Sequence, residues 1–169
     1  MFFALEISAE PEKIFPWIDN PEKAMRWQKG VKKGKIIEER PEKVGTTFIE
    51  EMGNGAKTLE MKGIITDHIE NKTIAFHLES KLHKVNVSYS LEGKNGKTIL
   101  KTEADIHWKF PMNLVNIIFG RKIRKDIQEQ METEFEELKR LCEQENNQTT
   151  KWNWKIKHDK QKNMDLLVA

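Results

Sequence analysis

Cysteine is almost absent from this sequence, since Cys142 is the single cysteine among 169 residues. An intramolecular disulfide is therefore excluded, and a lone thiol of this kind fits a small buried residue in a reducing compartment. The opening residues, MFFALEISAEPEK, have no basic segment and only a short apolar run, unlike a signal peptide. Together these features predict a cytoplasmic protein.

The sequence also lacks the features of two large function classes. Its 29 basic and 27 acidic side chains leave a formal net charge of +2, which gives no reason to expect nucleic-acid binding. No stretch approaches the ~20 consecutive apolar residues that a membrane-spanning helix needs. With 37% hydrophobic and 33% charged residues, the chain is typical of a globular protein with one core.

Catalytic and cofactor motifs are missing as well. The sequence contains no GxSxG, HExxH, CxxC, P-loop or GxGxxG motif, and Gly53-Asn54-Gly55 is too short to hold a phosphate. Its five histidines show neither the helical nor the strand spacing of a metal site, so no metal and no cofactor are expected. These absences favour a binding protein over an enzyme.

The strongest positive signal is a proline-free segment from Met112 to Glu145. Its apolar residues recur mostly every three or four positions, which places them on one stripe of a helix. Gly120 interrupts the segment and marks either a bend or a hinge. A helix of this length needs a partner surface for its stripe, which consists of Leu114, Ile118, Ile123, Ile127, Met131, Phe135, Leu138 and Cys142.

A series of strands precedes this helix. Residues 2–8 alternate in hydrophobicity and predict a first strand. Two short helices follow, opened by Pro11 and Pro21, and Pro16 limits the length of the first. From Gly30 onward, period-two alternation predicts six strands, at residues 31–40, 45–52, 57–69, 72–79, 82–92 and 97–109.

The connections between these strands are short. Asn54-Gly55 and Asn95-Gly96 are hairpin turns, because both residue types tolerate positive φ. Short links make neighbouring strands antiparallel, so the six strands form a meander. A long twisted sheet curls, and the C-terminal helix is the element long enough to cover its apolar face.

This order of elements resembles the helix-grip fold of the START/polyketide-cyclase (SRPBCC) superfamily. The segment RPEKVGTTF resembles the turn and glycine through which that family enters its next strand. The resemblance covers about residues 1–145, and Pro16 departs from it. The opening segment is similar to the family's opening pattern, in which a strand runs into a short helix and then into a Trp-x-x-Gly-Val sequence. The residues that match this pattern are Ile7, Ala9, Ile14, Phe15, Ile18, Asp19, Trp27, Gly30 and Val31.

The expected fold class is therefore α+β. A curved antiparallel sheet of about seven strands wraps around the long C-terminal helix, and two short helices follow the first strand. Residues 1–145 form this domain, and residues 146–169 form a C-terminal tail. Because Trp152, Trp154 and Ile156 alternate with polar residues, the tail is either an extra edge strand or a loosely docked segment. The alternative is a Trp/Lys anchor for an anionic surface.

The resemblance implies a cavity between sheet and helix that holds a hydrophobic small molecule or lipid. The alternative that it leaves open is a polyketide cyclase/dehydratase-like enzyme with a cavity carboxylate or histidine as acid/base. The residues expected to line the cavity are Trp27, Phe48, Glu50, Met61, Phe76, Val85, Val87, Tyr89, Ile106, Trp108, Ile123, Ile127 and Met131.

Glu50 and His83 are the candidate acid/base residues. Glu50 shares the predicted inner face with Phe48, where desolvation would raise the pKa of its carboxyl. A one-residue slip of the strand would instead turn Glu50 to solvent and place Ile49 inside. His83 lies at a strand end and is either a rim residue or a proton shuttle. Trp27 is expected at the cavity mouth, through packing or lid contact.

Four basic residues follow the apolar start of the long helix. They form either a solvated helix face or, together with residues 114–119, a contact with a membrane surface. In a third hypothesis, this basic run or the tail binds a protein partner. The basic run consists of Arg121, Lys122, Arg124 and Lys125.

Overall fold

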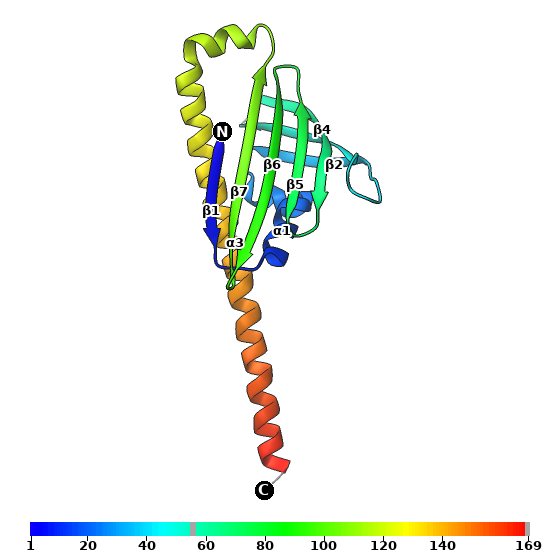
Figure 1. The fold of residues 1–169 in the computed structure, drawn as a ribbon, viewed down its shortest axis with the longest axis vertical. Helices are drawn as coiled ribbons and strands as arrows, with labels where there is room; N and C mark the ends of the chain where they lie inside the picture. The colour runs from blue at the N-terminus through cyan, green and yellow to red at the C-terminus, as the bar shows by residue number, and fades with distance from the viewer. Residues whose placement is uncertain (55–56, 168–169) are drawn as a thin grey trace.

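The computed structural model of the chain describes residues 1–54 and 57–167. Its strands form one antiparallel sheet of seven strands in the order β1-β7-β6-β5-β4-β3-β2 (Figure 1). In chain order, the elements are β1 (Phe2–Ile7), α1 (Pro11–Asp19), α2 (Pro21–Trp27), β2 (Val31–Glu38), β3 (Thr47–Asn54), β4 (Lys57–Ile69), β5 (Thr73–Glu79), β6 (His83–Lys94), β7 (Lys97–Trp108) and α3 (Met112–Leu167).

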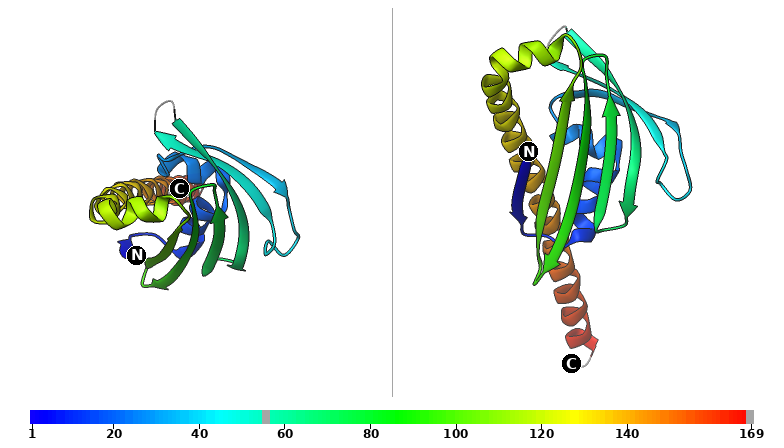
Figure 2. Two further views of the ribbon diagram at one scale, coloured as in Figure 1. Left: turned by 90° about the horizontal axis from the view of Figure 1, so that it is seen from above. Right: turned by 45° about the horizontal axis from the view of Figure 1, so that its top comes forward.

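The predicted meander and helix-grip arrangement are confirmed. Strands β2 to β7 each pair with their neighbours in the chain, and β1 pairs with β7 at the far edge. The sheet curves, and its concave side faces the three helices (Figure 2). Asn95 and Gly96 have φ values of 56° and 79°, as a two-residue β6–β7 hairpin requires. The turn predicted at Asn54-Gly55 includes residues 55 and 56, which lie outside the described residues.

The two short helices meet at Asn20. Its side chain accepts hydrogen bonds from the backbone N–H groups of Glu22 and Lys23, at 2.9 and 3.2 Å, and caps α2. Pro16 does not end α1, which continues to Asp19. Because Pro16 is the sixth residue of α1, its missing N–H deprives one carbonyl, that of Glu12, of its helical donor. Glu12 is exposed, so its carbonyl is accessible to solvent and is not buried without a donor.

Helix α3 is longer than its pattern predicts. It runs to Leu167 and extends past the sheet (Figure 1), so the interpretation of Trp152, Trp154 and Ile156 as an edge strand is wrong. No glycine or proline lies between Glu145 and Leu167, and a helix that has already formed propagates through such a sequence. The division of the chain at residue 145 stays a prediction.

The first turns of α3 cross one end of the sheet before the helix bends and runs along the concave face (Figures 1 and 2). Gly120 lies in this part of the chain, and the Arg124 side chain donates from Nε to the Gly120 carbonyl at 3.3 Å. The part of α3 after this bend carries the apolar stripe that packs against the sheet.

Among the side chains that the structure describes, those in the middle of α3 are packed most tightly. Phe135, Leu138 and Cys142 are fully buried in the main core, with side chains from β1, α1, α2, β5, β6 and β7. Polar contacts fix the same part of the helix to the β1–α1 connection. The amide of Ser8 donates to Glu143 at 2.9 Å, and the Asn146 side chain donates to the Ser8 carbonyl at 2.9 Å.

Candidate ligand-binding hollow

Next to this core, toward the end of the sheet where α3 begins, the concave face carries apolar side chains that are only half-buried. Cross-strand pairs show which residues face inward: Val87 lies opposite Phe76, and Val85 lies opposite Ile106. Apolar side chains that face the helix and still retain solvent exposure indicate an open space between the two layers. We call this space the hollow; its half-buried lining consists of Phe48, Phe76, Val85, Val87, Ile106, Trp108, Ile123, Ile127 and Met131.

Part of the hollow forms a discrete pocket of about 200 Å³ between β7 and α3. Ile106 and Trp108 line it from the sheet, and Ile123 and Ile127 line it from the helix. The rest of its lining consists of Met1, Ala104, Asp105 and Arg124. The structure therefore brings together the predicted lining residues of two elements that are distant in the sequence. Pockets of about 300 Å³ upward hold drug-sized ligands, so this pocket suits one portion of a ligand.

A larger depression of about 500 Å³ lies elsewhere, over outward-facing residues of β5, β6 and β7. Its lining includes Asn86, Ser88, Glu103 and Asp105, which belong to the solvent face of the sheet. This depression is open, and its lining mixes polar side chains with apolar ones, Phe2, Phe76 and Val87 among them. An open depression excludes water poorly, so the smaller and more enclosed inner pocket is the better candidate site for an apolar ligand.

Glu50 points into the concave side. It pairs with Met61, which is buried, whereas its neighbour Ile49 pairs with the exposed Lys62. The alternative register that would place Ile49 inside is therefore wrong. Burial raises the pKa of the Glu50 carboxyl to about 7, because desolvation disfavours its charged form. Among the described residues, the structure gives this carboxyl no hydrogen-bond or ion-pair partner.

Tyr89 lies where the hollow meets the packed core. Its ring contacts Phe76 on the hollow side and Phe135 on the core side, with centroid distances of 6.2 and 6.4 Å. The pKa of its phenol is raised, first by burial and then by the negative charges of Glu50 and Glu134. A hydrogen bond with the Gln28 side chain acts in the opposite direction on the same pKa.

These effects identify a polar cluster beside the hollow, which the sequence pattern does not reveal. Glu134 accepts hydrogen bonds from the Gly30 amide at 3.1 Å and from the Gln130 side chain at 2.9 Å. One signal was available, because Glu134 is three residues after Met131 and four before Leu138, and so lies on the buried stripe. We define the polar cluster as Gln28, Glu50, Tyr89, Gln130 and Glu134.

His83 lies at the rim of the hollow. Its ring is 5.0 Å from the Trp108 ring, and its Nδ1 is 3.3 Å from the Ser80 hydroxyl. Partial burial and the positive charge of Lys109 lower its pKa, so the imidazole is neutral at neutral pH. Because β4 and β5 separate the strands of Glu50 and His83, the two candidates do not form a pair.

The prediction that Trp27 lies at the cavity mouth is wrong. Trp27 is 2% exposed, donates from Nε1 to the Trp17 carbonyl at 2.8 Å and packs against the Phe135 ring. Trp17 is buried too, and its Nε1 donates to Glu145 at 2.9 Å. Both tryptophans join the short helices to the gripped part of α3, and neither is placed as a lid. Met61 is also buried, behind the lining.

The approach of Gly63 to Phe48 gives a prediction for the shape of the hollow. The two residues are cross-strand partners, and a Cβ at position 63 would overlap the Phe48 ring. We expect Gly63→Ala to push the ring into the hollow and weaken binding of an apolar probe such as Nile red by about tenfold. Gly34→Ala is the control, because its nearest neighbour would be at an ordinary contact distance of 3.9 Å. Equal fluorescence titrations for both variants would contradict the prediction.

Neither a membrane-spanning helix nor a cluster of metal ligands is found in the described part of the chain. Within residues 1–54 and 57–167, no helix is long and apolar enough to cross a membrane. In the same ranges, His, Cys, Asp and Glu side chains form no group of three or more that is placed to hold a metal ion.

Comparison with known families and with curated proteins finds no match. Solved structures do match. A START superfamily protein from Mycobacterium smegmatis has a TM-score of 0.71 at 18% identity, over 85% of this chain and 97% of that one. The Zhui aromatase/cyclase from Streptomyces sp. R1128 has a TM-score of 0.71 at 8% identity, over 85% and 92%. TTHA0849 from Thermus thermophilus has a TM-score of 0.71 at 14% identity, over 84% and 95%. At these identities the likeness shows the fold, and the chain has the helix-grip fold.

Proposed function

We propose that this protein binds a hydrophobic small molecule or lipid in the hollow between the sheet and α3. The observation that carries the proposal is the row of inward-facing apolar side chains that stay half-exposed opposite the helix stripe. Each Å² of apolar surface that a ligand covers contributes about 25 cal/mol, so a ligand gains free energy that the protein alone does not. The helix-grip fold of a START protein and of an aromatase/cyclase supports this class of ligand.

The polar cluster gives the site a means of orienting its ligand. Below about pH 7 the Glu50 carboxyl carries a proton and can donate a hydrogen bond to a ligand oxygen. Above that pH it is an acceptor, suited to a hydroxyl or an ammonium group. The expected ligand is therefore amphipathic, with an apolar body against α3 and one polar group near Glu50.

Native mass spectrometry of gently purified protein, followed by solvent extraction, tests the proposal directly. The expected result is a co-purifying apolar compound that is released on extraction. If the protein carries no such compound and also fails to bind a panel of fatty acids, isoprenoids and aromatic polyketides, the proposal is wrong.

Filling the inner pocket should abolish binding. We expect Ile106→Trp to reduce the affinity for an apolar ligand by at least about tenfold, because the larger side chain occupies the space between β7 and α3. Glu103→Trp is a matched control three residues earlier on β7, because it fills the outer depression instead. Isothermal titration with the extracted compound compares the two variants, and equal affinity losses would place the ligand elsewhere.

The pKa of Glu50 supports a second candidate function, a polyketide cyclase/dehydratase-like enzyme. A carboxyl that titrates near neutral pH is suited to general acid/base catalysis. In this role Glu50 would transfer a proton at a substrate oxygen or carbon held against the apolar wall; His83 at the rim is the other candidate. Glu50→Gln should then abolish turnover of a poly-β-ketone substrate while leaving its affinity within about threefold. Unchanged turnover would remove Glu50 from this role.

A further inference from the structure

Large apolar side chains are exposed at one end of the molecule. Phe110 is 77% exposed, Phe119 55% and Leu82 38%. They come from the β7–α3 junction, the start of α3 and the β5–β6 turn. The Lys109 amide donates to the Leu82 carbonyl at 2.9 Å, which holds the turn against the junction. The first turns of α3 cross the same end of the sheet (Figure 1). We call Leu82, Phe110 and Phe119 the apolar tip.

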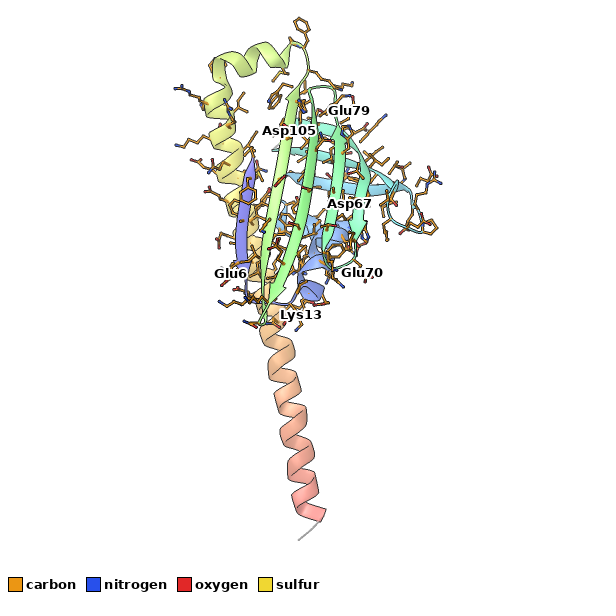
Figure 3. All side chains as sticks on the ribbon, in the orientation of Figure 1. Glu6, Lys13, Asp67, Glu70, Glu79 and Asp105 are labelled. Atoms are coloured by element: carbon orange, nitrogen blue, oxygen red, sulfur yellow. The ribbon has the colours of Figure 1, made fainter. Side chains whose placement is uncertain are left out.

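Basic side chains surround this tip. Glu79 is also at this end of the sheet (Figure 3), but it already pairs with Lys109 at 2.6 Å and with Lys84 at 3.4 Å. Lys125 pairs with Glu129 at 3.5 Å. In the described part of the chain, Lys81, Arg121 and Lys122 have no acidic partner. The basic side chains of this end are Lys81, Lys84, Lys109, Arg121, Lys122, Arg124 and Lys125; Asp126 follows the run on α3, and Asp105 lies on β7, so the basic side chains still outnumber the acidic ones.

Further along α3, acidic residues predominate. Between residues 129 and 145 the helix has only two basic side chains, Lys139 and Arg140. The acidic side chains of the same stretch are Glu129, Glu132, Glu134, Glu136, Glu137, Glu143 and Glu145. A negatively charged surface therefore attracts the tip end of α3 and repels the stretch that follows it, residues 129–145. The last part of the helix is basic again, with five lysines and two aspartates between residues 151 and 167, so charge alone does not orient the molecule. The exposed rings of the apolar tip favour docking at that end.

We infer that the apolar tip docks on an anionic lipid surface. Exposed phenylalanines next to unpaired lysines and arginines match the two layers of such a surface, since the rings enter the interface and the cations meet the headgroups. A second copy of the chain fits less well, because a twofold contact would bring two basic surfaces together. The rings project from loops and a helix start, which form a convex end and not a groove for a peptide.

The docking surface adjoins the hollow. Trp108 lies in the pocket lining, only two residues before Phe110. Ile123 lines the same pocket, four residues after Phe119. A ligand could therefore pass between the lipid layer and the hollow without crossing much water, although docking does not require that the hollow binds any ligand.

Flotation of the full chain with vesicles tests the inference. Vesicles of equal parts phosphatidylcholine and phosphatidylglycerol should bind the protein, whereas vesicles of phosphatidylcholine alone should bind it weakly. Phe110→Ser and Phe119→Gln should each weaken the partition by about tenfold. Phe2→Thr is the matched control, because Phe2 is 65% exposed but lies on β1, opposite Glu103, away from the tip. It should leave the partition unchanged.

Charge variants separate the headgroup contribution. Reversing Arg121 and Lys122 together to glutamate should weaken binding to the anionic vesicles at least about 25-fold and reduce its dependence on salt. Reversal of Lys32 and Lys35, which are exposed on the edge strand β2, is the control and should have a small effect. Far-ultraviolet circular dichroism verifies that every variant is folded.

Three results would overturn the inference. The first is failure of the unaltered protein to float with anionic vesicles at low salt. The second is a loss of binding in Phe2→Thr equal to that in Phe110→Ser. The third is concentration-dependent dimerisation without lipid that Phe110→Ser abolishes, because the tip would then be a protein interface.

Discussion

Phe135→Ala is expected to lower the free energy of unfolding by about 3–5 kcal/mol. The Phe135 side chain is 2% exposed, and its ring stacks on Phe3 at a centroid distance of 4.7 Å. It also contacts the Trp27 ring at 5.6 Å and the Tyr89 ring at 6.4 Å. One side chain thus joins β1, α2 and β6 to α3, and its loss leaves a cavity that this crowded set of rings cannot close.

Met131→Ala, one turn earlier on the same stripe, is the matched control. Met131 is half-buried beside the hollow, so its truncation should cost only about 1 kcal/mol. Urea unfolding monitored by tryptophan fluorescence measures both variants. Similar losses of stability would mean that the hollow is packed as tightly as the core, which would contradict both this prediction and the proposed ligand site.

Glu50→Gln is expected to stabilise the protein by about 2 kcal/mol at pH 8 and to have little effect near pH 4.5. The usual pKa of a glutamate is 4.5, and burial raises that of Glu50 to about 7. The full difference corresponds to about 3 kcal/mol, and partial solvent exposure of the side chain reduces the expected cost to about 2 kcal/mol.

The direction follows from proton binding. As pH rises above 4.5, the unfolded chain loses the Glu50 proton while the folded protein keeps it. The folded state then binds more protons, so stability falls with rising pH until the folded carboxyl ionises near pH 7. Glutamine does not ionise, so the variant avoids this loss, and its advantage over the unaltered protein is constant above that pH.

Glu51→Gln provides the control for Glu50→Gln. Glu51 follows Glu50 on β3 but faces outward, where its carboxylate lies 3.6 Å from the Lys33 ammonium. An exposed pair of this kind contributes less than about 1 kcal/mol, so the variant should have nearly unchanged stability at both pH values. The experiment is urea unfolding across this pH range. A stabilisation by Glu50→Gln that does not change with pH would show that the carboxyl is not desolvated.

Most of the fold could be predicted from the sequence, because strand and helix periodicities differ strongly here. Alternation from Val31 to Trp108 placed six strands within a few residues of their observed limits, and Asn95-Gly96 fixed one hairpin. The end of α3 could not be predicted in the same way. Trp152, Trp154 and Ile156 have strand-like spacing, but cooperative helix propagation from residues already in α3 overrides it.

The candidate site could be predicted only in part. Strand alternation correctly placed Glu50 inside, because a side chain's face follows from register once Phe48 is assigned. The polar partners could not be predicted, because Gly30 reaches Glu134 and Gln28 reaches Tyr89 only after the α2–β2 connection folds over the helix. Trp27 was misplaced for a related reason: a tryptophan near a helix end has the same local pattern in a core as at an opening.

The pairing of β1 with β7 has a consequence for how the chain folds. In the sheet, β1 is paired with β7, about a hundred residues later in the chain, and the Asn146–Ser8 hydrogen bond joins residues 138 positions apart. Contacts between residues this far apart in the chain form slowly, because closing the long intervening loop costs entropy before the contacts are made. During synthesis, β2 to β7 emerge with an uncovered apolar face until α3 follows. The nascent chain is therefore most prone to aggregation late in translation, before α3 covers the apolar face of the sheet.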